Sequence, residues 1–198
     1  APMPLQMIDK GIPKGHEGAP IGTTGLLAQV VVAKHDDHLP LYRQEAMLER
    51  EVGLAISRGT PDGWVMAVGE SLAPVVAGMR RDLLLVTYLQ ADETTVPVQM
   101  HDKRGADHQA YLWQYGKPGG ETVFDFQMGR GREGPAKFLK DWNGILQTDG
   151  YQSYDQVGGP GMVRVGCWAH ARRKFVDAVK VSPKDADAEG MVLRMDGL

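Results

Sequence analysis

The hydrophobic pattern of this chain changes its period near residue 84, and that change limits the folds the sequence can adopt. Before residue 84, apolar residues recur at helical spacing. After it, they come in short runs rich in β-branched and aromatic residues, which is typical of strands. The runs at 83–90, 109–115 and 121–127 predict three strands, and the GKPGG sequence at 116–120 predicts a hairpin loop.

The remaining elements alternate between strands and helices. The sequence predicts a short helix at 135–142, strands at 144–149 and 162–168, and a helix over 168–180. A three-strand meander followed by crossovers predicts an α/β fold, with a mixed sheet of about five strands and helices on its faces.

The part of the chain before the sheet divides in two. Residues 1–25 are dense in Pro and Gly, which predicts a linker, and residues 26–80 predict a small helical segment. Within that segment Pro40 opens a helix that Gly53 ends. A further helix starts at Thr60 and is kinked or split by Pro74. Residues 84–182 then form the sheet-containing domain, and residues 183–198 begin another helical region.

Composition excludes several classes of protein. The 198 residues include 22 basic and 25 acidic residues and one Cys, for a net charge of −3. A lone Cys excludes a disulfide scaffold, and the near-neutral charge excludes a wholly basic nucleic-acid binder. We see no secretion signal and no apolar run long enough for a membrane span, so we expect a cytoplasmic protein with no membrane partner. Because no initiator Met is present, we expect the chain to begin within a longer protein.

Two aspartates directly follow apolar runs, at points where buried strands are predicted to end. Asp92 follows the first run and Asp149 the fourth. If these strands are neighbours, the carboxylates converge, and at about 4 Å they repel by roughly 4 kcal/mol at an effective dielectric constant near 20. A shared proton or a bound cation would offset this repulsion, and carboxylate oxygens suit Mg²⁺ or Mn²⁺. The alternative is that both aspartates only form turns.

Two further patterns also have structural alternatives. Cys167 and His170 form half of a zinc pattern, but a structural zinc site needs four ligands, and a small buried Cys beside a His is the simpler interpretation. Residues 129–134 match the G-x-G-x-x-G pattern of dinucleotide-binding loops. The preceding strand belongs to a hairpin and the following helix is short and polar, so we expect a flexible turn instead.

The last predicted helix lies in a basic segment. Residues 164–184 contain six Lys or Arg residues and one acid, Asp177, so their local charge is 6 − 1 = +5. Phosphate contacts dominate nucleic-acid affinity, and Arg172, Arg173 and Lys174 are therefore candidates for binding DNA. The alternative is a solvated helix face with an i, i+4 pair between Arg173 and Asp177.

Several blocks together resemble transposases of the insertion sequence 66 family. They run in order from about residue 8 to 180, and the chain carries them as QADET (90–94), YLW (111–113), GILQTDGY (144–151) with Tyr154, CWAHARRKF (167–175), and upstream KGIP (10–13), LLAQ (26–29), HLPLYRQ (38–44) and ISR (56–58). The resemblance implies an RNase H-like catalytic core with an Asp-Asp-Glu triad, in which Asp92 and Asp149 are the first two acids and Mg²⁺ or Mn²⁺ is the cofactor.

The resemblance also implies a function and partners. The implied function is metal-dependent cleavage and strand transfer in DNA transposition. The implied partners are transposon-end DNA and target DNA, on which the protein assembles as a homo-oligomer at the nucleoid. Cys167 and His170 resemble a Cys/Asp-x-x-His element that positions the active site of such transposases. Residues 56–64 resemble a helix-turn-helix remnant, although Gly59 and Gly63 interrupt it.

One departure from the family pattern is important. The family's Glu lies in an Asn-Asn-x-x-Glu-Arg-like block with no counterpart here, and the nearby acids Asp177 and Glu189 lie in other contexts. We therefore interpret the chain as an internal fragment with two of three metal ligands, inactive alone in strand transfer. Two alternatives are an RNase H-like nuclease or resolvase, and a catalytically inactive DNA-binding remnant.

Overall fold

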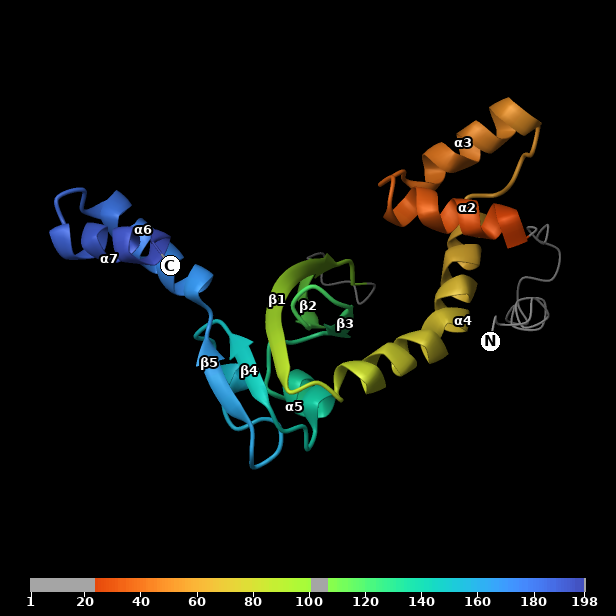
Figure 1. Cartoon of the computed structure of the whole chain (residues 1–198). Helices are drawn as coiled ribbons and strands as arrows, with labels where there is room; N and C mark the ends of the chain where they lie inside the picture. Colours follow the sequence, from red (N-terminus) through yellow and green to blue (C-terminus); the bar gives the residue numbers. More distant parts are fainter. Residues whose placement is uncertain (1–23, 101–106, 198) are drawn as a thin grey trace. The chain divides into compact units, whose positions relative to one another are not determined.

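The computed structural model describes residues 24–100 and 107–197, and the chain divides into two compact units between Ala77 and Gly78 (Figure 1). The helices are α2 (Thr24–His35), α3 (Leu41–Val52), α4 (Gly59–Leu83), α5 (Glu133–Leu139), α6 (Trp168–Val181) and α7 (Ala186–Asp196), with a 3-10 turn η1 (Gln152–Tyr154). The strands are β1 (Tyr88–Val98), β2 (His108–Gly116), β3 (Thr122–Gln127), β4 (Ile145–Thr148) and β5 (Val163–Gly166). Of the predicted linker, residues 1–23 lie outside the described residues.

The first unit is helical and has its own small core. Its buried apolar residues are Leu27, Val30, Ile56 and Trp64. Gln44 of α3 is also buried, and its side-chain amide donates hydrogen bonds to the carbonyl oxygens of Leu39, at 2.9 Å, and Val30, at 3.3 Å. These bonds satisfy the buried polar group and join α3 to α2.

Helix boundaries in this unit largely follow the sequence pattern. Pro40 precedes α3, and Gly53 ends it in the left-handed conformation with φ of +67°. Helix α4 begins at Gly59 and runs through Pro74 without ending, so Pro74 does not split the helix. An internal proline removes one i→i−4 hydrogen bond, and the turns on either side of Pro74 remain helical.

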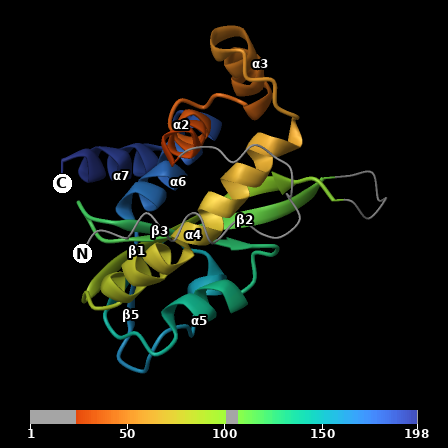
Figure 2. The ribbon, with the colours of Figure 1, turned by 90° about the vertical axis from the view of Figure 1, so that its right-hand side faces the viewer.

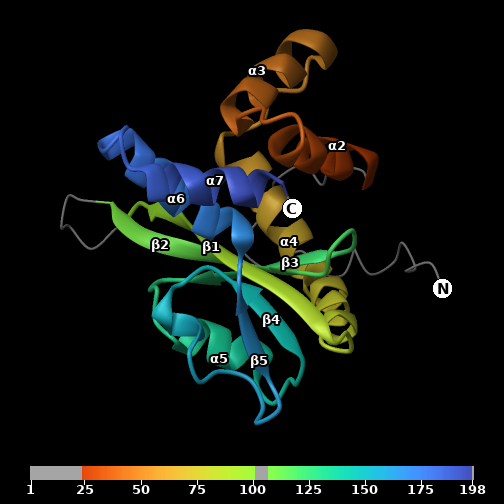
Figure 3. The ribbon, with the colours of Figure 1, turned by 60° about the vertical axis from the view of Figure 1, so that its left-hand side comes forward.

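The second unit is built on a mixed five-stranded sheet, as the sequence predicts. The strand order is β3-β2-β1-β4-β5. Strands β1, β2 and β3 form an antiparallel meander, whereas β4 pairs parallel to β1, and β5 pairs parallel to β4 (Figure 3). The predicted hairpin loop is present between Gly116 and Thr122. The crossover from β3 to β4 carries α5, as parallel pairing requires.

One face of the sheet is buried and the other is open. The buried face carries Leu89, Trp113, Tyr115 and Leu146, none of which is exposed. Helix α5 covers this face (Figure 2), and the ring of Phe138 stacks on that of Tyr115 with 3.7 Å between centroids. Along β1 the side chains alternate, so that residues 89 and 91 are buried while residues 90 and 92 are exposed.

The first strand does not begin where the apolar run predicts. The run at 83–90 is divided: Leu83 ends α4, residues 84–87 form a turn, and β1 starts at Tyr88. Backbone bonds from Leu84 to Arg80 and from Leu85 to Asp82 continue the helical turn past α4. Burial explains the difference, because Leu83 packs into the core whereas Leu85 is 82% exposed. An apolar run alone does not distinguish a buried strand from a buried helix end.

The C-terminal part forms a helical hairpin. Helix α6 spans Trp168–Val181, close to the predicted 168–180, and packs against α7. Asp185 caps α7 by accepting a hydrogen bond from the backbone N–H of Ala188 at 3.0 Å. Within residues 24–100 and 107–197, none of the helices combines the length and the apolar content that crossing a bilayer would require.

Truncating the sheet core should destabilise the protein. We expect Leu146→Ala to lower the free energy of unfolding by about 2–5 kcal/mol, because it leaves a cavity among fully buried side chains. The matched variant Leu85→Ala, at an exposed position, should change it by less than about 0.5 kcal/mol. Urea denaturation measures both values. Equal effects of the two variants would contradict this description of the core.

Candidate functional site

Parallel pairing of β1 and β4 places the two predicted site aspartates in equivalent positions. The last pair in the register is Gln90 with Gln147, and Asp92 and Asp149 each lie two residues further along. The expectation that the first and fourth strands are neighbours is therefore confirmed. Asp92 itself does not end its strand, contrary to the prediction, because β1 continues to Val98. It lies instead where β4 ends and β1 goes on with β2 as a partner.

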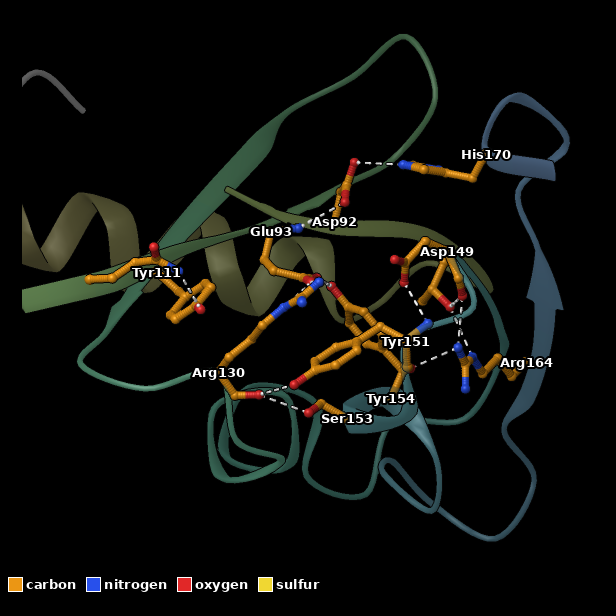
Figure 4. A network of polar contacts seen from close by, with 12 residues as sticks. Asp92, Glu93, Tyr111, Arg130, Asp149, Tyr151, Ser153, Tyr154, Arg164 and His170 are labelled. Carbon is orange, nitrogen blue, oxygen red and sulfur yellow. Dashed lines mark hydrogen bonds and ion pairs between the residues drawn. The ribbon is translucent and has the colours of Figure 1, made fainter. Parts of the chain in front are cut away.

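Asp92 lies on the open face of the sheet and faces α6. One carboxylate oxygen, Oδ1, accepts a hydrogen bond from the backbone N–H of Glu93 at 2.9 Å. The other, Oδ2, lies 3.6 Å from Nε2 of His170 (Figure 4). About half of the Asp92 side chain is exposed. The carboxylate is therefore accessible to a solvated cation or a substrate.

Asp149 begins the segment that follows β4. Its Oδ1 accepts a hydrogen bond from the backbone N–H of Tyr151 at 2.8 Å, which is an Asx turn. This contact is the one expected from the turn-forming interpretation of Asp149. Because a carboxylate has about four lone-pair sites, one such bond leaves acceptor capacity for a cation.

Cys167 and His170 lie beside Asp92 at the start of α6. The backbone N–H of Cys167 donates to the carbonyl of Thr148 at 2.8 Å, which ties the start of α6 to the end of β4. A cavity of about 190 Å³ next to Asp92 is lined by Gln90, Ala91, Asp92, Gln114, Gln147, Cys167 and His170. Nδ1 of His170 is buried and has no hydrogen-bond partner among the residues that the structure describes.

A buried acid on the opposite face of β1 was missed by sequence reasoning. The side chain of Glu93 is only 2% exposed. Its Oε2 accepts a hydrogen bond from the hydroxyl of Tyr154 at 2.7 Å, and its Oε1 accepts one from Nε of Arg130 at 2.9 Å. Burial, followed by the Glu93 hydrogen bond, raises the pKa of the Tyr154 phenol well above its ordinary value. This tyrosine therefore acts as a neutral donor.

Arg130 links Glu93 to the segment after β4. Its guanidinium lies over the ring of Tyr151, 3.7 Å from the centroid. Its carbonyl oxygen accepts hydrogen bonds from the hydroxyls of Ser153, at 2.8 Å, and Tyr151, at 3.1 Å (Figure 4). The only available signal was indirect: Arg130 lies in the G-x-G-x-x-G stretch, and Tyr151 and Tyr154 follow Asp149 closely.

The structure gives the G-x-G-x-x-G stretch no dinucleotide-binding geometry. Strand β3, which precedes it, pairs antiparallel with β2, whereas the fingerprint belongs to a parallel βαβ unit. Helix α5, which follows, has only seven residues. Both observations agree with the argument made from the sequence.

Arg164 holds the segment after β4 from the other side. Its guanidinium donates to Oγ1 of Thr148 at 2.8 Å and to the carbonyl oxygens of Asp149, at 2.7 Å, and Tyr151, at 2.9 Å. It also forms an ion pair with Asp155. Arg164 is thus a structural residue, and its charge does not belong to an open basic surface.

Ion pairs reduce the basic surface predicted for residues 164–184. Nη2 of Arg172 donates to Asp196 of α7 at 3.0 Å. That contact raises the pKa of Arg172 and lowers the pKa of Asp196, in each case mainly through the shared hydrogen bond. The alternative of an i, i+4 pair between Arg173 and Asp177 is wrong, because Asp177 forms its ion pair with Lys180. Arg173 and Lys174 are exposed.

The donor set at Asp92 and Asp149 fits a hard divalent cation in part. Across residues 24–100 and 107–197, no cluster of three or more His, Cys, Asp or Glu side chains is arranged to hold a metal. Two carboxylates with water in the remaining positions are nevertheless an ordinary arrangement for Mg²⁺. Both carboxylates keep lone pairs that their hydrogen bonds to backbone N–H groups leave unused, and Asp92 is half exposed.

Comparison of the sequence with known proteins finds one matching family and several relatives. Residues 21–197 match the model of a family described as "Transposase IS66 family". The chain is 34% identical over 190 residues to the uncharacterized protein y4qI of Sinorhizobium fredii, covering 88% of the chain and 33% of that protein. It is 31% identical over 197 residues to y4jD of the same organism, covering 92% of the chain and 36% of that protein. The chain thus spans about a third of these relatives.

Replacing Arg164 should weaken the segment that carries Asp149. We expect Arg164→Lys to lower the free energy of unfolding by about 1–3 kcal/mol, because an ammonium group cannot make all of these bonds at once and leaves carbonyl oxygens without donors. Arg173→Lys, at an exposed position, is the matched control and should change it by less than about 0.5 kcal/mol. Urea denaturation again gives both values. An Arg164→Lys variant with the same free energy of unfolding as the wild type would contradict the structural role of Arg164.

Proposed function

Because this chain belongs to the IS66 family of transposases, we propose that it is part of a DNA transposase in which Asp92 and Asp149 bind Mg²⁺ or Mn²⁺ for DNA cleavage and strand transfer. The observation that supports this most strongly is the register of β1 and β4, in which the two aspartates each lie two residues beyond the last register pair. Since the chain covers about a third of its relatives, the activity of the whole protein is part of the proposal.

The sheet topology supports the same assignment. An RNase H-like core is the fold that the family resemblance implies, and the order β3-β2-β1-β4-β5 with two parallel pairs is compatible with it. In such a core the acids of the first and fourth strands lie side by side. In this proposal the scaffold holds the two carboxylates near each other, and the bound cation offsets their repulsion.

Each residue of the site has a defined task in this proposal. Asp92 and Asp149 hold the cation, while His170, 3.6 Å from the Asp92 carboxylate, orients that carboxylate together with Cys167. When bound there, a pair of Mg²⁺ ions would supply activation of the attacking oxygen and stabilisation of the leaving oxygen in an in-line displacement at phosphorus. A third acid is required for the complete triad, and none lies with Asp92 and Asp149 among the residues described here.

The DNA partners follow from the chemistry. Transposon-end DNA and target DNA both present phosphates, and the exposed Arg173 and Lys174 are suited to bind them. Arg172 can join them only by giving up Asp196. Assembly of a homo-oligomer on the DNA, on the bacterial nucleoid in the cytoplasm, completes the proposal.

Metal binding tests the proposal directly. We expect the purified chain to bind Mn²⁺ weakly, as measured by loss of the free Mn²⁺ signal in electron paramagnetic resonance, and Mg²⁺ to compete. Asp92→Asn and Asp149→Asn should each abolish this binding, because each removes one of two charged ligands. Asp155→Asn, which removes a nearby acid that pairs with Arg164, is the matched control and should retain it.

Two results would contradict the proposal. Mn²⁺ binding that survives both Asp92→Asn and Asp149→Asn would place the cation elsewhere. Absence of Mn²⁺ binding together with retained DNA binding would favour a catalytically inactive DNA-binding remnant.

DNA binding should depend on the exposed cations of α6. We expect Arg173→Ala and Lys174→Ala each to weaken binding uniformly across DNA sequences and to lower the salt slope by about one unit. Arg172→Ala should have a smaller effect, because its charge is already paired with Asp196. Fluorescence anisotropy over a range of salt concentrations measures both quantities. An unchanged slope in the Arg173 and Lys174 variants would remove these residues from the DNA interface.

A further inference from the structure

We propose that Arg130, in the glycine-rich loop between β3 and α5, is a positioning residue that fixes Asp92 relative to Asp149. The inference rests on the proposed function, because it concerns the metal site of Asp92 and Asp149. It assigns a role to the 129–134 stretch, which neither the dinucleotide interpretation nor the transposase assignment uses. Arg130 acts from the buried face of the sheet, behind the open face that carries Asp92.

The first half of the argument concerns β1. Glu93 is the residue next to Asp92, and its side chain points to the other face, where it is 2% exposed. A carboxylate buried this deeply requires a partner. Both Nε and Nη2 of Arg130 donate to its Oε1, and Tyr154 donates to its Oε2. The backbone at residues 92 and 93 is thereby anchored by charge-assisted bonds.

The second half concerns the segment after β4. The same guanidinium lies 3.7 Å from the ring centroid of Tyr151, and the Arg130 carbonyl accepts bonds from the hydroxyls of Tyr151 and Ser153. The backbone N–H of Tyr151 in turn donates to Oδ1 of Asp149. A continuous path of contacts therefore runs from the residue beside Asp92, through Arg130, to the carboxylate of Asp149 (Figure 4).

One glycine of this stretch, Gly134, lies where space is tight. A Cβ atom at Gly134 would lie 3.1 Å from Cγ of Gln127 and 3.4 Å from Nε1 of Trp113. The chain therefore enters α5 in close contact with the sheet, and a side chain at residue 134 would require the side chain of Gln127 or Trp113 to shift by a few tenths of an ångström. This close approach holds the loop where Arg130 reaches Glu93, with no nucleotide involved.

The experiment measures Mn²⁺ affinity in the whole chain by electron paramagnetic resonance. Residues that support metal ligands typically change metal affinity by about 10–100-fold when replaced, so we expect Arg130→Gln to weaken Mn²⁺ binding by about tenfold or more. Arg130→Lys keeps the charge but loses the two-pronged contact, and it should give an intermediate affinity. Arg132→Gln is the matched control, because the one side-chain hydrogen bond of this neighbouring arginine, among the residues that the structure describes, is a 3.5 Å contact with Gln156. Its affinity should equal that of the wild type.

Fold integrity is monitored in the same samples by near-ultraviolet circular dichroism and thermal unfolding. If Arg130→Gln does not fold, Tyr151→Leu replaces it, since that variant removes the ring beneath the guanidinium and leaves Glu93 paired. A folded variant with weakened Mn²⁺ binding, partly restored by lysine, supports the positioning role. A folded Arg130→Gln or Tyr151→Leu variant with wild-type affinity overturns it.

The outcomes separate this inference from the proposed function. Wild-type Mn²⁺ binding that requires Asp92 but is indifferent to Arg130 overturns the positioning role alone. Absence of Asp92-dependent Mn²⁺ binding in the wild type overturns the metal site, and the positioning role with it.

Discussion

The parallel pairing of β1 with β4 is the constraint on which the rest of the structure depends. It sets Asp92 and Asp149 two residues beyond the same register pair. It also requires a crossover, which supplies α5 to cover the buried face of the sheet. Under the proposed function, a bound cation would offset the repulsion between these two carboxylates.

The two faces of the sheet carry different parts of the candidate site. On the open face, the Asp92 carboxylate is half exposed and lies close to His170. On the buried face, Glu93 is paired with Arg130 and Tyr154; the Glu93 side chain is 2% exposed, whereas that of Arg130 is 41% exposed. Because successive residues of a strand point to opposite faces, one dipeptide serves both purposes. An ion pair with one buried partner is weak evidence for stability, and under our proposal its role is to fix the backbone geometry beneath Asp92.

Sequence periodicity was sufficient for most elements and for a mixed sheet, because alternation and apolar runs record burial directly. It left open whether the first and fourth strands are neighbours, which the pairing of β1 with β4 answers. It was wrong about residues 83–90, where an apolar run serves a helix end and a turn before the strand. It also counted Arg164 and Arg172 as open charges, since ion pairs such as that of Arg172 with Asp196 join residues far apart in sequence. Glu93 was missed for the same reason: its burial depends on Arg130, 37 residues away.

The central claim is that Asp92 and Asp149 share one divalent cation. Crystals of the chain grown with MnCl₂ and measured for Mn anomalous scattering test it most directly. The account predicts an anomalous peak bonded to carboxylate oxygens of both aspartates, and its disappearance in crystals of the Asp92→Asn variant. Carboxylates ordered on opposite sides of the sheet, or a peak found away from both residues, would contradict it.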